Sequence, residues 1–290
     1  MSHTILFAVI CLCALGVASA VILYFIAQKF KVYEDPSIEI VTSMLPGANC
    51  GGCGVAGCGA LAEAIVTSTD LNKYKCPVGG NETMKAIATF LGLQPEMMEP
   101  QTAVIRCNGS KINAPSRSKY EGAESCAFAN YLSAGESGCP YGCLGEGDCV
   151  RACQFDAIKM DKATGLPVVD DDKCLACGAC VTTCPRSIIE LRPKGMKNRR
   201  IYISCINKEK GAIARKNCET ACIGCGKCVK VCTFDAITLV NNLAYIDASK
   251  CKLCRKCVTE CPTNSIIELN FPPRKEKSGE TEIAAQIETV

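Results

Sequence analysis

The arrangement of the cysteines constrains this chain more than any other feature of its sequence. Its 290 residues include 26 cysteines and one histidine. Two runs share the spacing Cys-x2-Cys-x2-Cys-x3-Cys-Pro, and they begin at Cys174 and Cys251. In bacterial ferredoxins this spacing holds [4Fe–4S] clusters, with three thiolates on one cluster and the fourth on a second. The pattern therefore predicts iron–sulfur clusters and one-electron chemistry.

Other uses of clustered cysteines fit this pattern less well. Disulfide scaffolds are typical of short secreted chains, whereas the ferredoxin spacing requires free thiolates, which a reducing cytosol preserves. Structural zinc sites usually combine two separated cysteine pairs, often with histidine. A zinc scaffold, which would be colourless and free of sulfide, is the alternative. The net charge of +3 gives no indication of nucleic-acid binding.

An uncharged apolar segment precedes the cysteine-rich region. It runs for 23 residues, from Ile5 to Ala27, which is long enough to cross a bilayer as a helix. Lys29 and Lys31 follow it, and positive charge tends to stay on the cytoplasmic side. We expect a single-pass anchor in the bacterial inner (cytoplasmic) membrane, with the cluster domains on the cytoplasmic side. A cleavable signal peptide is the alternative, because residues 18–20 (Ala-Ser-Ala) resemble a cleavage site.

Residues 139–270 contain an internal repeat. Cys184 and Cys261 are 77 residues apart, and the motif Cys-x-Phe-Asp-Ala-Ile occurs at both Cys153 and Cys232. The repeat predicts two tandem ferredoxin-like modules, each with two cluster half-motifs. We expect short β hairpins around Ile158–Val169 and Ile237–Ile246.

The predicted fold class is α+β, with an N-terminal transmembrane helix, a small helical [4Fe–4S] domain and two tandem bacterial-ferredoxin-like modules. The tail is charged and without an apolar pattern, which predicts disorder. The predicted segments are a transmembrane anchor (1–27), a linker (28–40), the [4Fe–4S] domain (41–80), a connector (81–138), module 1 (139–192), an inter-module segment (193–217), module 2 (218–270) and a disordered tail (271–290).

The small domain has its own cysteine spacing, Cys50-x2-Cys53-x4-Cys58, followed by Cys76-Pro77. Glycines between these cysteines let the backbone wrap closely around a cluster and point N–H groups at its sulfurs. Residues 52–57 also match the dinucleotide fingerprint G-x-G-x-x-G. That fingerprint must follow a buried strand, and no strand pattern precedes it, so we do not expect nucleotide binding there.

Two-cluster ferredoxins combine three cysteines of one run with the last cysteine of the other. Module 2 follows this rule, but in module 1 Glu146 occupies the position that matches Cys225. We expect Cys139, four residues before the run, to supply the missing thiolate; ligation by Glu146 or a three-iron cluster is the alternative. The five predicted clusters are held by Cys50, Cys53, Cys58 and Cys76 (cluster 1); Cys139, Cys143, Cys149 and Cys184 (cluster 2); Cys153, Cys174, Cys177 and Cys180 (cluster 3); Cys222, Cys225, Cys228 and Cys261 (cluster 4); and Cys232, Cys251, Cys254 and Cys257 (cluster 5).

Six cysteines fall outside these sets, and we expect them to be free thiols, because free cysteines are commonly buried as small apolar residues. A sixth cluster built from Cys107, Cys126, Cys205 and Cys218 is less favoured, since these four positions share no local spacing. The six are Cys11, Cys13, Cys107, Cys126, Cys205 and Cys218.

In the order of its motifs, the chain resembles the B subunits of Rnf complexes, the membrane-bound ferredoxin:NAD oxidoreductases that pump Na⁺ or H⁺. The resemblance covers the anchor, the domain with Asn49-Cys-Gly-Gly-Cys53, and the ferredoxin modules; the second module resembles the longer form found in anaerobes. It implies that Cys50, Cys53, Cys58 and Cys76 are cluster ligands. The spacing Cys139-x3-Cys143-x5-Cys149 departs from the simpler pattern of the short members.

The resemblance also implies partners. Electrons would come from reduced soluble ferredoxin and pass to flavin-bearing membrane subunits, while NAD is reduced on another subunit. The residues agree, because no flavin, NAD or acid/base constellation is visible and this chain alone has no complete active site. Rival interpretations are a wiring subunit of a hydrogenase or formate-type oxidoreductase, and a non-enzymatic iron–sulfur sensor.

A basic loop between the modules is a candidate docking patch for an acidic ferredoxin. It contains Lys194, Lys197, Arg199 and Arg200. An ordinary solvated loop is the alternative.

Overall fold

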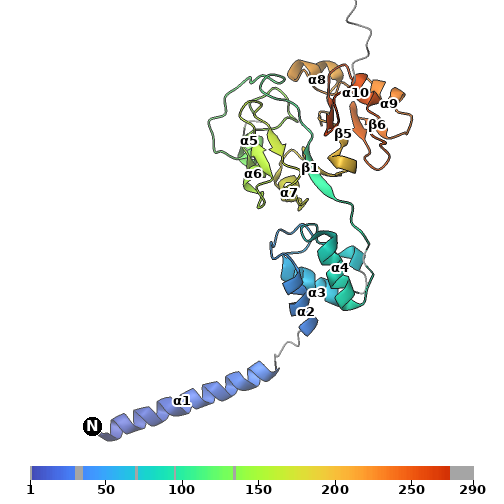
Figure 1. The fold of residues 1–290 in the computed structure, drawn as a ribbon. Coiled ribbons are helices and arrows are strands. Elements are labelled where there is room, and N and C mark those ends of the chain that lie inside the picture. The colour runs from blue at the N-terminus through green and yellow to red at the C-terminus, as the bar shows by residue number, and fades with distance from the viewer. Residues whose placement is uncertain (1, 30–34, 69–70, 95, 133–134, 275–290) are drawn as a thin grey trace, which may run out of the picture.

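The structure is a computed structural model that describes residues 2–29, 35–68, 71–94, 96–132 and 135–274. A long helix stands apart from three compact bodies, which follow one another along the chain (Figure 1). The part of the predicted tail beyond residue 274, and residues 30–34 of the predicted linker, lie outside the described residues.

The long helix, α1, spans Ser2–Lys29. Its stretch Ile5–Lys29 is long and apolar enough to cross a membrane, and none of its most apolar window is buried inside the protein. At 1.5 Å per residue these 25 residues extend roughly 37 Å, more than the hydrocarbon core of a bilayer.

The first body is helical and contains α2 (Pro36–Met44), α3 (Cys58–Thr67), the 3₁₀ turn η1 (Leu71–Lys73) and α4 (Gly80–Leu91). Asp35 caps α2 by accepting a hydrogen bond from the Ser37 N–H at 2.8 Å. Val41, Leu61 and Ile87, one from each helix, meet in a single core. The core thus extends beyond the predicted domain 41–80: α2 begins inside the predicted linker, and α4 belongs to the predicted connector.

Module 1 contains β1 (Gln101–Ile105), α5 (Cys126–Leu132), α6 (Asp148–Arg151), β2 (Ile158–Met160), β3 (Pro167–Val169), α7 (Ala179–Thr183) and β4 (Ile189–Pro193). Strands β2 and β3 form the predicted hairpin, with Ile158 opposite Val169. Strand β1 pairs antiparallel with β4, from Gln101 opposite Pro193 to Ile105 opposite Ile189.

Module 2 repeats this plan. It contains β5 (Arg200–Ile203), α8 (Gly211–Asn217), α9 (Lys227–Val231), β6 (Ile237–Val240), β7 (Leu243–Ile246), α10 (Lys256–Thr259) and β8 (Ile266–Leu269), preceded by the 3₁₀ turn η2 (Met196–Asn198). The predicted hairpin is β6–β7. Strand β5 pairs antiparallel with β8, as β1 pairs with β4.

Strands β1 and β5 were not expected, because they lie in the predicted connector and inter-module segment. Each pairs with the last strand of its module and is largely buried, and each ends two residues before a cysteine. Cys107 follows Ile105 and Cys205 follows Ile203.

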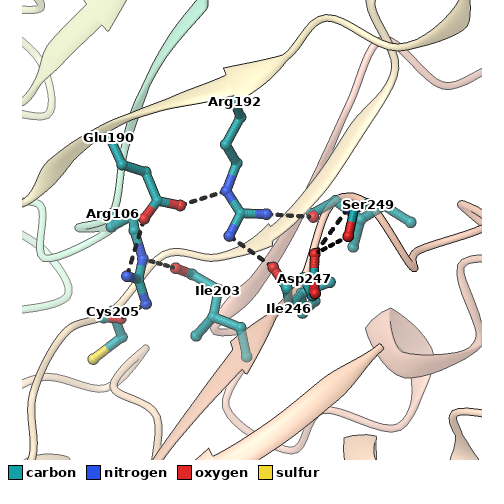
Figure 2. Close-up of polar contacts among 9 residues, drawn as sticks. Arg106, Glu190, Arg192, Ile203, Cys205, Ile246, Asp247 and Ser249 are labelled. Atoms are coloured by element: carbon teal, nitrogen blue, oxygen red, sulfur yellow. Dashed lines mark hydrogen bonds and ion pairs between the residues drawn. The ribbon is translucent and has the colours of Figure 1, made fainter. Parts of the chain in front are cut away.

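Two arginines from module 1 join the modules (Figure 2). Arg106, just after β1, donates to the carbonyl oxygens of Ile203 and Cys205, both at 3.3 Å. It also forms an ion pair with Glu190 on β4, with 3.2 Å between Nη1 and Oε2.

Arg192 on β4 reaches further into module 2. Its Nη2 donates to the Ile246 carbonyl at 2.8 Å and its Nη1 to the Ile201 carbonyl at 3.4 Å, while its Nε pairs with Glu190. The guanidinium lies 5.1 Å from the ring centre of Tyr245, a cation–π contact, and the side chain is only 4 % exposed. A buried charge is tolerated only with partners of this kind.

Candidate metal centres

Two cavities in module 2 are each lined by four cysteines, and the non-atom space in each is about 320 Å³. They contain the two ligand sets predicted for this module: Cys222, Cys225, Cys228 and Cys261 in one, and Cys232, Cys251, Cys254 and Cys257 in the other. The helices α9 and α10 each contribute one buried cysteine, Cys228 and Cys257.

Burial makes three of these thiols, Cys228, Cys251 and Cys257, harder to ionise, because it raises their pKa. Burial and, to a smaller extent, the nearby Cys251 and Cys254 together raise the pKa of the Cys257 thiol to about 12. At Cys261 burial also acts upward, but hydrogen bonds from the Ser265 hydroxyl and from backbone groups leave its pKa lowered. Because metal ligation needs thiolates, loading such a site releases protons and compensates the repelling charges.

Module 1 has a similar cavity of about 390 Å³. Cys143, Cys149 and Cys184 line it as expected, but the fourth cysteine is Cys126. The predicted fourth ligand, Cys139, lines a different cavity. The cysteines around this cavity therefore differ from those of predicted cluster 2, because Cys126 lines it and Cys139 does not.

The first residue of α5 is Cys126, and α5 is held in place by Asp148. The Asp148 carboxylate accepts hydrogen bonds from Ser125 Oγ at 3.0 Å and from the Ala127 N–H at 3.1 Å. Glu146 does not line the cavity; its backbone forms a hydrogen bond with the Cys126 thiol. Cys126 lies 17 residues upstream of Cys143, so no local spacing in the sequence links it to this cavity.

The remaining set of module 1 gathers Cys153, Cys174, Cys177 and Cys180. The Cys180 thiol interacts electrostatically with the other three thiols of this set. Backbone N–H groups point at two of the sulfurs: Ala157 N lies 3.4 Å from Cys153 Sγ, and Ala103 N lies 3.5 Å from Cys174 Sγ. Such N–H···S bonds are typical of cluster-binding loops.

The first body brings together three of its four predicted cysteines, Cys53, Cys58 and Cys76. Cys76 interacts electrostatically with Cys53 and Cys58 and accepts a hydrogen bond from the Gly79 N–H at 3.3 Å. The loop is fixed by Asn49, whose Oδ1 accepts from the Cys58 N–H at 2.8 Å.

This loop lies directly against module 1. The Cys50 and Cys177 thiols interact electrostatically. A Cβ on Gly52 would lie 2.5 Å from the Cys177 carbonyl oxygen, closer than real Cβ contacts allow. Only glycine permits this approach, so the cysteine set of the first body and that of module 1 are neighbours.

A further cavity, of about 370 Å³, lies where the two modules meet. Four cysteines line it, although three of them were expected to be free thiols and the fourth was assigned elsewhere. They are Cys107, Cys139, Cys205 and Cys218. The two cysteines of the apolar segment, Cys11 and Cys13, are exposed on α1.

The candidate docking patch is not a continuous charged surface. Arg200 is buried and forms an ion pair with Asp171 at 2.6 Å. Lys194 donates to the Asp171 carbonyl at 2.6 Å, and the Arg199 guanidinium lies 5.6 Å from the ring centre of Phe271. Lys197 is exposed. The inclusion of Arg200 in a docking surface is therefore wrong, because its charge is used inside the fold.

Among the described residues, no three His, Cys, Asp or Glu side chains are gathered closely enough to hold a single metal ion. Thiolates around one zinc ion, at about 2.3 Å from it, lie about 3.8 Å apart. In a cubane each thiolate binds a different iron, so the sulfurs lie further apart. Four cysteines around one cavity, without a group that could hold a single ion among the described residues, fit a polynuclear cluster.

Two family models match the chain. One, described as a putative Fe-S cluster, covers residues 45–78, and the other, a 4Fe-4S dicluster domain, covers residues 137–188 and 221–265. Together with the fold, they define a [4Fe–4S] electron-transfer protein with two ferredoxin-like modules.

Curated relatives extend this match to most of the chain. It is 45 % identical to the B subunit of a Na⁺-translocating ferredoxin:NAD⁺ oxidoreductase complex of Acetobacterium woodii, over 83 % of this chain and 71 % of that protein. It is 40 % identical to the B subunit of an ion-translocating oxidoreductase complex of Methanosarcina acetivorans, over 92 % of this chain and 99 % of that one. It is also 36 % identical to the B subunit of a proton-translocating ferredoxin:NAD⁺ oxidoreductase complex of Clostridium ljungdahlii, over 91 % of this chain and 92 % of that protein. The chain belongs to this family of B subunits of ion-translocating oxidoreductase complexes, which confirms the resemblance inferred from its motifs.

Proposed function

We propose that this chain carries electrons from reduced soluble ferredoxin to flavin-bearing membrane subunits of an ion-translocating complex, which reduces NAD on another subunit. The helix α1 would anchor it in the bacterial inner membrane, with the cysteine-rich bodies on the cytoplasmic side. The proposal is supported by the family and by the succession of cysteine sets from module 2 to the body that follows α1.

Five [4Fe–4S] clusters would be held by the predicted sets, with Cys126 in place of Cys139 in cluster 2. When bound, they supply one-electron transfer. The chain's own part is to keep neighbouring sets close, because tunnelling slows steeply with distance. Two contacts serve this purpose within the modules: Cys228 lies near Cys257, and Cys149 lies near Cys180. A third, between Cys177 and Cys50, leads to the first body.

Electrons would enter at module 2, where ligand thiols reach the surface. Cys225 and Cys254 are exposed, whereas the equivalent Cys177 of module 1 is half-buried against the first body. Exposed Lys252 and Lys256 flank Cys254. These two lysines give the surface around Cys254 the positive charge that attracts an acidic electron carrier.

The function is tested by mixing the anaerobically purified complex with reduced ferredoxin and following cluster reduction. We expect rapid reduction of this chain, followed by reoxidation when NAD⁺ is added to the complete complex. A preparation with Zn²⁺ and no sulfide, or one reduced by hydrogen or formate but not by ferredoxin, would contradict the proposal.

The entry site gives a separate prediction. The double variant Lys252→Glu/Lys256→Glu should slow reduction by ferredoxin about tenfold at low salt, because electrostatic steering is reversed. The difference should shrink as salt rises. Lys85→Glu/Lys162→Glu is the matched control, since both lysines are exposed and it makes the same charge change away from Cys254. Equal rates for the two double variants at low salt would place the entry site elsewhere.

A further inference from the structure

We propose that a sixth [4Fe–4S] cluster is held between the two modules by Cys107, Cys139, Cys205 and Cys218. The inference goes beyond the five sets above and rests on the iron–sulfur ligation proposed there. None of these four cysteines shares local spacing with another, so the site exists only in the folded chain.

The first support is the cavity itself. Its volume, about 370 Å³, falls within the range of about 320 to 390 Å³ found for the three cavities lined by cluster motifs. Cys139, Cys205 and Cys218 are buried, with exposures of 7, 9 and 8 %. The space between these four cysteines is therefore of the same size as the space between the cysteines of the cluster motifs.

The second support is the internal repeat. Cys107 and Cys205 occupy equivalent places in the two modules. Cys107 lies two residues beyond the end of β1, and Cys205 lies two residues beyond the end of β5. Cys139 and Cys218 are also equivalent, since each lies four residues before the first cysteine of its module's run. Each module thus contributes the same two positions, and the site is formed where the two copies face each other.

The third support is hydrogen bonding to the sulfurs. The Asn207 N–H lies 3.4 Å from Cys205 Sγ, and its side-chain Nδ2 lies 3.6 Å from Cys139 Sγ. Asn207 is 1 % exposed, and its side-chain amide is held in place by Glu209, because Nδ2 also donates to Glu209 Oε2 at 3.2 Å and Oδ1 accepts from the Glu209 N–H at 2.7 Å. Donors aimed at sulfur stabilise the charge of a ligated thiolate.

Gly109 provides a close backbone approach to the same place. A Cβ added there would lie 3.5 Å from Cys107 Sγ and 3.7 Å from Cys218 Sγ. A side chain at this position would therefore enter the space between two of the ligand sulfurs. The neighbouring Arg106 fixes the two sides relative to each other, because it follows β1 and donates to the Cys205 carbonyl (Figure 2).

The position of the site gives it a role. On the module 1 side, the Cys143 N–H donates to Cys107 Sγ at 3.4 Å. On the module 2 side, the Cys205 thiol interacts with Cys222 and accepts a hydrogen bond from its backbone. Cys143 and Cys222 belong to clusters 2 and 4, so the sixth cluster would connect the path in module 2 to the path in module 1.

The test is iron and sulfide content together with native mass spectrometry of the anaerobically purified protein. We expect about 24 iron and 24 sulfide per wild-type chain, rather than about 20. Cys205→Ala and Cys218→Ala should each lose about four iron, or one iron with the EPR signal of a three-iron cluster. Cys13→Ala, in the apolar helix, is the control and should lose none.

Two comparisons keep the result interpretable. Cys126→Ala should lose the iron of cluster 2 and keep that of the sixth site, whereas Cys139→Ala should do the reverse; the reduced EPR spectra of the two variants should differ. If a Cys218 variant fails to fold, the wild-type mass still separates six clusters from five. A wild-type content of about 20, with a Cys139–Cys218 disulfide, a bound Zn²⁺ or free thiols at the site, would overturn the sixth cluster while leaving the proposed function intact. Absence of iron altogether would overturn both.

Discussion

Replacing Gly52 with alanine should slow electron transfer between module 1 and the first body, while leaving the iron content of both unchanged. The reason is steric. The added Cβ would lie 2.5 Å from the Cys177 carbonyl oxygen and 3.0 Å from its Cα, and backbone atoms of a ligand loop cannot rotate away as a flexible side chain can. The two loops must move apart, and tunnelling slows steeply with the added distance.

The measurement is rapid-mixing reduction by ferredoxin, followed by freeze-quench EPR. In the Gly52→Ala variant, the module signals should appear at the wild-type rate and the signal of the Cys50–Cys76 set severalfold or more later. Gly59→Ala is the matched control, because a Cβ there meets nothing within 4 Å and Gly59 lies inside helix α3. Unchanged kinetics in Gly52→Ala, with the iron retained, would show that electrons do not cross at Cys177.

Local patterns predicted those parts of the molecule that are built from neighbouring residues. The hairpins at Ile158–Val169 and Ile237–Ile246 formed as expected, because a turn joins two short strands. Both module 2 ligand sets were also found together, since each run carries three ligands of one set within seven residues. The helix α1 followed from an uninterrupted apolar stretch.

What local patterns missed depends on distant pairing. Strand β1 has no hairpin partner, because Gln101 pairs with Pro193 across most of module 1. Cys126 lines its cavity from the start of α5, where the Asp148 carboxylate, distant in sequence, accepts a hydrogen bond from the Ala127 N–H. One signal was nevertheless present in the sequence. Two of the 26 cysteines lie in the apolar segment, and the other 24 are the number that six clusters with four thiolates each would need.

Replacing Arg192 with leucine should weaken the joint between the modules by about 3 kcal/mol, the scale expected when one partner of a buried ion pair is removed. The substitution deprives the carbonyl oxygens of Ile201 and Ile246 of their donor and leaves Glu190 with Arg106 as its remaining partner. It also removes the cation–π contact with Tyr245.

Because cluster loss is irreversible, the readout is the guanidinium concentration at which cluster absorbance disappears at a fixed time. We expect a lower midpoint for Arg192→Leu, and little recovery in Arg192→Lys, since an ammonium group cannot reproduce the planar fork that reaches two carbonyls at once. Lys119→Ala is the control, as Lys119 and Glu121 form an exposed ion pair worth little. An unchanged midpoint in Arg192→Leu would mean that the modules are held together by other contacts. A lowered midpoint with the inter-module iron lost first would tie the joint to the proposed site, because the same interface positions Cys205 opposite Cys107.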